Sequence, residues 1–139
     1  MIKQEYLIVH LEDKEYHPDD IINRQFKGYS PDMTVQEVYD SARAFWSVDE
    51  DRFKNVISVL GVNNDGKVVI KIAPDDGSLE TVSEADIERN KLNKGAKYFT
   101  GQFTTDSEDD SKVGQTLSIK WTRQSFIYKT ESEIEELIV

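Results

Sequence analysis

A tight turn between two strongly apolar runs constrains the fold of this chain more than any other feature. Residues 56–62, VISVLGV, are apolar and rich in β-branched side chains, and residues 67–72, KVVIKI, resume that pattern after the turn NNDG. Asn, Asp and Gly tolerate the backbone angles of a hairpin turn, so the stretch predicts a β-hairpin. Only Ser58 and Gly61 interrupt the first run, which predicts a strand covered on both faces. Gly61 marks either a bulge or the close approach of another backbone.

A helix is predicted directly before this hairpin. Residues 34–37, TVQE, have the form of a capping box, in which the Thr34 hydroxyl and the Glu37 carboxylate accept hydrogen bonds from backbone amides. Apolar and aromatic side chains then recur at helical spacing: Val35, Val38, Tyr39, Ala42, Phe45 and Trp46. We therefore expect a helix over residues 35–46. A weaker cap at residues 47–50 predicts a short helical turn after it.

Shorter apolar runs predict the remaining elements. Strands are expected over residues 5–11, 97–104, 117–121 and 125–128, helices after Ser83 and over residues 130–139, and a loop with one helical turn over residues 12–30. Residues 105–111 carry no apolar anchor and predict an exposed, mobile loop. Five or six short strands and three or four helices, without regular alternation, predict one α+β domain over residues 1–139. Its sheet is expected to be mostly antiparallel and curved, and a half-open barrel is one form of it.

Composition narrows the classes of protein that this chain can represent. Its 27 acidic and 17 basic residues give a net charge of −10 and a pI near 4.6, which opposes non-specific attraction to nucleic acid or anionic lipid. The absence of cysteine excludes disulfides, zinc-thiolate sites and cysteine nucleophiles. No apolar run is long enough to span a bilayer, and residues 1–5, MIKQE, lack the apolar core of a signal peptide. We expect a soluble, cytoplasmic protein.

The residues that usually carry catalysis or bind metals form no known motif. His10 and His17 are the only histidines, and a site formed with Asp13 matches no recognised ligand spacing. The carboxylates of residues 106–110 lack the glycine and the closing glutamate of a calcium loop. Neither a nucleophile elbow nor a glycine-rich phosphate loop occurs. We therefore expect no enzymatic activity, no metal and no cofactor.

Two arginines and a tryptophan form the candidate ligand-binding site. Arg43 lies one turn from Trp46, and Arg52 follows a short polar turn. Guanidinium and indole groups in one pocket can stack on a planar ligand or grip a phosphate. The alternative is packing, in which the arginines cover the indole or pair with the acidic residues 49–51.

These positions also resemble a small prokaryotic module. Its pattern joins A-[TS]-R-x-x-W to a later arginine, to a strand ending in v-l-a-V-x-x-G-x-[IV], and to a final F-x-G. The matching positions are Ala42, Arg43, Trp46, Arg52 and residues 59–62, 66–69 and 97–101. The chain departs from the pattern at Ala42 and Ala44, and residues 63–64 lengthen the turn.

The module is found in proteins of unknown function and beside GIY-YIG-type nuclease-like segments, although this chain has no nuclease motif. The resemblance implies an accessory role in handling nucleic acid or in host defence. It carries over Arg43, Trp46 and Arg52 as the site residues.

Three functions follow from these observations. The first is a non-enzymatic binding module that holds a nucleotide, a nucleic-acid base or a peptide on the surface of Arg43, Trp46 and Arg52. The second is an acidic protein partner whose carboxylates imitate a phosphate backbone, and the third is a small hydrolase centred on His10. Nucleic acid, a nucleotide or a protein is the expected partner, and a membrane is not. An exposed strand over residues 117–121 would allow two subunits to pair, so the oligomeric state stays open.

Overall fold

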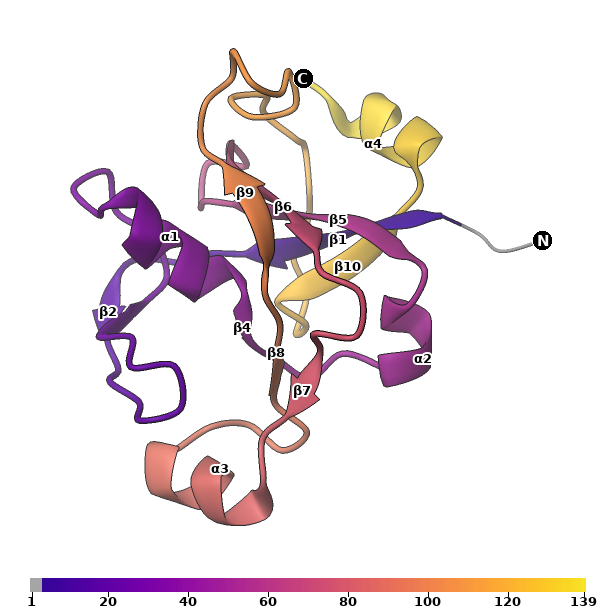
Figure 1. Cartoon of the computed structure of the whole chain (residues 1–139). Helices are drawn as coiled ribbons and strands as arrows, with labels where there is room; N and C mark the ends of the chain where they lie inside the picture. Colours follow the sequence, from indigo (N-terminus) through magenta and orange to yellow (C-terminus); the bar gives the residue numbers. More distant parts are fainter. Residues whose placement is uncertain (1–3) are drawn as a thin grey trace.

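A five-stranded mixed sheet forms the centre of the structure, a computed structural model that describes residues 4–139 (Figure 1). Its strands, in spatial order, are β10 (Phe126–Lys129), β1 (Glu5–His10), β5 (Val56–Val62), β6 (Val68–Pro74) and β9 (Gly101–Thr104). β1 and β5 run parallel, and the other neighbours are antiparallel. The predicted hairpin is confirmed as β5 and β6, and the first strand lies inside the sheet.

Two smaller sheets and several short helices surround this sheet. β2 (Glu15–Tyr16) pairs with β3 (Phe26–Lys27), and β8 (Lys97–Tyr98) lies between β4 (Ala44–Trp46) and β7 (Glu80–Thr81). The helices are α1 (Val35–Ala42), α2 (Glu50–Phe53), α3 (Glu84–Asn90) and α4 (Glu131–Leu137). The predicted single α+β domain is confirmed, and its central sheet is open, with β10 and β9 at the edges. No helix within residues 4–139 has the length and apolar character needed to cross a bilayer.

Both faces of the central sheet are covered by apolar side chains. The alternation of β1 sends Leu7 and Val9 to the face covered by α1, and sends Ile8 to the opposite face. On that opposite face Ile8 belongs to a cluster with Leu117 and with Ile134 of α4. Burial of each such side chain stabilises the fold by about 1.5–3 kcal/mol, so β1 is held from both sides.

Gly61 combines both roles that its position predicts. The β5–β6 register shifts between Gly61 and Val62, as at a bulge. A Cβ at Gly61 would lie 2.7 Å from Cγ2 of Ile70 and 3.0 Å from Cδ1 of Leu11. The close approach therefore comes from side chains rather than from another backbone.

The helix predicted over residues 35–46 ends early, at Ala42. Arg43 caps it, and residues 44–46 form β4, in which Ala44 pairs with Tyr98 of β8. The Trp46 indole Nε1 donates a hydrogen bond of 2.8 Å to the Ala42 carbonyl at the helix end. Sheet pairing therefore prevails over the helical spacing of the aromatic residues.

Other predicted elements also differ from the structure. The strand predicted over residues 117–121 is wrong, because only Leu117 makes a bridge there, to Ile138. The strand predicted over residues 97–104 divides into β8 and β9. Residues 12–30 contain the β2–β3 ribbon instead of a helical turn. The predicted exposure of residues 106–109 and the C-terminal helix are confirmed.

Candidate functional site

Arg43 ties the end of α1 to the segment between β8 and β9. Its Nε donates a hydrogen bond of 2.9 Å to Oδ1 of Asp40, and its Nη1 donates one of 3.2 Å to the Phe99 carbonyl. The guanidinium carbon lies 5.2 Å from the centre of the Tyr39 ring. With its side chain only 12% exposed, Arg43 is bound mainly to the protein itself.

Arg52 links α2 to the first strand. Its Nε and Nη2 donate a paired set of hydrogen bonds, of 3.1 and 3.0 Å, to the two oxygens of Glu5. These hydrogen bonds raise the pKa of Arg52 above its ordinary value. The guanidinium also lies 4.0 Å from the centre of the Tyr128 ring, and 49% of the side chain is exposed.

Trp46 lies in a third environment. It is half-buried against the α1 face of the core, and one part of it lines a cavity of about 450 Å³. The arginine that lines this cavity is Arg24 rather than Arg43 or Arg52. The structure therefore leaves the three residues predicted from the sequence apart, with Trp46 at the cavity.

The cavity lies between the end of β1, the β2–β3 ribbon, β4 and the β5–β6 turn. The lining residues that matter for its chemistry are His10, Asp13, Arg24, Phe45, Trp46 and Asn64. Its volume falls in the range of about 300–1,000 Å³ that is usual for ligand pockets. We call it the β4 cavity.

Arg24 is a buried cation with unused hydrogen-bonding capacity. It is 6% exposed, its Nη1 donates a hydrogen bond of 2.7 Å to the Ala44 carbonyl, and its guanidinium lies 4.8 Å from the Phe45 ring centre. Its Nε lies 3.7 Å from Oδ2 of Asp19, too far for a hydrogen bond. Nε and Nη2 thus form no hydrogen bond with any residue from 4 to 139. Burial lowers the pKa of Arg24 to about 10, which leaves it charged at neutral pH.

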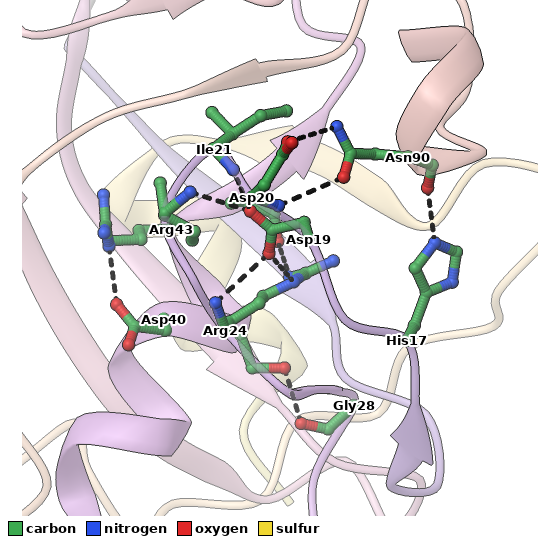
Figure 2. A network of polar contacts seen from close by, with 12 residues as sticks. His17, Asp19, Asp20, Ile21, Arg24, Gly28, Asp40, Arg43 and Asn90 are labelled. Carbon is green, nitrogen blue, oxygen red and sulfur yellow. Dashed lines mark hydrogen bonds and ion pairs between the residues drawn. The ribbon is translucent and has the colours of Figure 1, made fainter. Parts of the chain in front are cut away.

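The segment that carries Arg24 is shaped by the carboxylate of Asp19. Its Oδ1 accepts hydrogen bonds of 2.8 and 2.7 Å from the amides of Ile21 and Ile22, and its Oδ2 accepts one of 3.3 Å from the Arg24 amide. The Asp19 side chain is fully buried. Figure 2 shows it at the centre of these contacts, between the turn and the Arg24 guanidinium.

Asn90, the last residue of α3, holds the same segment from outside (Figure 2). Its side chain accepts a hydrogen bond of 3.1 Å from the Asp20 amide and donates one of 2.9 Å to Oδ1 of Asp20. The Asn90 carbonyl lies 2.9 Å from Nε2 of His17. α3 therefore fastens the segment from His17 to Arg24 that forms one wall of the β4 cavity.

At the other side of the cavity, His10 begins a short chain of polar contacts. Its Nε2 lies 2.8 Å from Oδ1 of Asn64, and Nδ2 of Asn64 donates a hydrogen bond of 2.9 Å to Oδ1 of Asp13. The imidazole stacks on Trp121 with ring centres 4.7 Å apart. Within the described part of the chain, no three His, Asp or Glu side chains form a set that could hold a metal ion.

A comparison with known protein families, curated proteins and solved structures finds no match for this chain. The resemblance to the small prokaryotic module therefore stays a prediction. The description of the site consequently depends on the geometry of the β4 cavity alone.

Proposed function

We propose that this protein is a non-enzymatic binding module whose ligand occupies the β4 cavity. The observation that carries this proposal is the charged, buried guanidinium of Arg24, which lines the cavity with unused donors. A guanidinium removed from water favours a carboxylate or phosphate partner, because charge-assisted hydrogen bonds are the strongest that a side chain makes. Phe45 and Trp46 add aromatic surface to the same cavity. A nucleotide, a nucleic-acid base or a peptide are the ligand classes that suit this lining.

In this proposal Arg43 and Arg52 support the site without touching the ligand. Arg43 fixes the end of α1, directly before β4, through Asp40 and Phe99. Arg52 fixes α2 to β1 through Glu5. Trp46 is the one residue of the predicted set that lies at the cavity.

A fluorescence titration tests the proposal. The probes are mononucleotides, short single-stranded oligonucleotides and short peptides, added at low salt while tryptophan emission is followed. We expect a saturable change for at least one class of probe, and Trp46→Phe separates its signal from that of Trp121. Arg24→Lys keeps the charge but loses the planar fork, and should weaken binding about ten-fold. Arg89→Lys, on the exposed face of α3, is the control, and a flat signal with every probe would contradict the proposal.

One observation favours a second candidate, a small hydrolase. His10 lines the cavity and is linked through Asn64 to the carboxylate of Asp13, an arrangement that orients an imidazole. Hydrolysis of chromogenic esters and phosphodiesters by the wild type, abolished in His10→Gln, would support it. Turnover that is equal in both proteins would reject it.

A further inference from the structure

The inference concerns the sign of the charges on the walls of the β4 cavity, and it depends on the binding function proposed above. We propose that the cavity takes a small zwitterionic ligand, such as an amino acid or a short peptide with free termini. Its carboxylate lies at Arg24, and its ammonium group lies at Asp13 and Glu12.

The two charged ends of the cavity are built from different parts of the fold. Arg24 is fixed to β4 through the Ala44 carbonyl and the Phe45 ring. Asp13 is instead held by Asn64, in the turn between β5 and β6. Because separate elements position them, the opposite charges are kept apart within one cavity.

The cation and the carboxylates of the lining are not paired with one another. No ion pair within residues 4–139 joins Arg24 to Asp13 or Glu12, although all three line the cavity. Asp13 uses Oδ1 for Asn64, which leaves Oδ2 without a hydrogen bond to the described residues. The other lining cation, Lys27, is engaged with Glu15 at 3.0 Å. Charges of both signs therefore stay available to a ligand.

A ligand with charge of only one sign fits this lining less well. The lining contains three carboxylates, of Glu12, Asp13 and Glu15, and two cations, Arg24 and Lys27, which gives a formal charge of −1. A nucleotide phosphate would bring further negative charge to the carboxylates, whereas a simple amine would leave Arg24 without a counter-ion. A zwitterion satisfies both ends at once. Its side chain would then lie against the aromatic surface of Phe45 and Trp46.

Calorimetry with chemically blocked ligands tests the ligand class. The probes are free dipeptides with small, aromatic and acidic side chains (Gly-Gly, Ala-Phe and Ala-Glu), their N-acetyl and C-amide forms, and adenosine monophosphate. We expect at least one free dipeptide to bind, and each blocking group to weaken it about ten-fold, because each removes one charge-assisted contact.

Two variants assign the two ends of the ligand. Arg24→Lys should weaken the free dipeptide but leave the C-amide form unchanged, because that form has no carboxylate to lose. Asp13→Asn should weaken the free dipeptide but leave the N-acetyl form unchanged. Asp76→Asn, an exposed aspartate outside the lining, is the matched control.

The outcomes separate this inference from the binding function itself. Binding of adenosine monophosphate without any dipeptide would overturn the zwitterion and keep the binding module. Equal affinity for free and blocked dipeptides would also overturn it. No binding of any probe would contradict both proposals.

Discussion

The central sheet and the region around the β4 cavity are stabilised in different ways. In the sheet, β1, β5 and β6 carry side chains that are buried on both faces, and neighbouring strands pair along most of their length. The polar lobe, which we define as β2, β3, the segment from His17 to Arg24, β4 and α3, is joined by side-chain hydrogen bonds. The sheet therefore depends on apolar burial, and the lobe depends on a few polar groups.

This difference indicates where a ligand site can form. A tightly packed apolar sheet has little capacity for an unpaired charge, because an isolated buried charge is costly. The polar lobe supplies Asp19 as a partial counter-ion for Arg24, and the sheet supplies fixed positions for His10. The cavity lies where the two regions meet, so the sheet gives it rigidity and the lobe gives it charge.

The largest effect should come from the centre of the sheet. Leu60→Ala removes a fully buried side chain from β5 and should lower the free energy of unfolding by about 3–5 kcal/mol. Urea unfolding followed by circular dichroism measures this loss. Ile57→Ala, in the same strand but with a 40% exposed side chain, is the control and should cost less. Equal losses would contradict an apolar origin of the sheet's stability.

A smaller and more local effect is expected at Asp19. Asp19→Asn keeps the shape of the side chain but removes the charge that accepts three amide hydrogen bonds and faces Arg24. The expected cost is about 2–3 kcal/mol, because hydrogen bonds to charged groups are strong. Hydrogen exchange should show lost protection at Ile22 and Arg24, with β1 and β5 unchanged. Uniform loss across the sheet would show that lobe and sheet are one cooperative unit.

A still smaller effect is expected where α3 meets the lobe. Asn90→Ala removes the side-chain contacts to Asp20 and should cost about 1–2 kcal/mol, seen as faster amide exchange in α3. Glu88→Ala, on the exposed side of the same helix, should leave that exchange unchanged. If both variants behave alike, Asn90 is not the fastening residue.

Acid should separate the two regions without any mutation. Hydrogen bonds from Arg89 and Asn90 hold the pKa of Asp20 below its ordinary value of about 4. Because the folded state binds this proton less readily than the unfolded state, the stabilising contribution is present above that value and disappears as the pH falls through the lowered pKa. Protection of α3 should therefore fall in acid before that of β5. In Asp20→Asn this difference in pH dependence should disappear, and parallel loss in the wild type would contradict the assignment.

The sheet was predictable because its signal is local. The apolar runs of β1, β5 and β6 identify strands whatever they pack against. The same reasoning extended α1 to Trp46, since helical spacing does not reveal that Ala44 pairs with Tyr98, far along the chain. Tertiary pairing of this kind has no signature in the local sequence.

The cavity was only partly predictable for the same reason. Trp46 lies at it, as an indole beside charged residues suggested, but Arg43 and Arg52 found carboxylates of their own in Asp40 and Glu5. Arg24 carried no signal, because its burial depends on contacts with segments outside its own. A buried and an exposed arginine look alike in a sequence with no regular pattern around them.

The central claim is that Arg24 receives a ligand in the β4 cavity. The most direct measurement follows the Nε–H resonance of Arg24 by nuclear magnetic resonance, assigned by its loss in Arg24→Lys, during titration with Ala-Phe and with adenosine monophosphate. The account predicts a saturable shift of this resonance with one probe, while the resonances of Arg52 and Arg89 stay in place. An Arg24 resonance that stays fixed at saturating concentrations of both probes would contradict it.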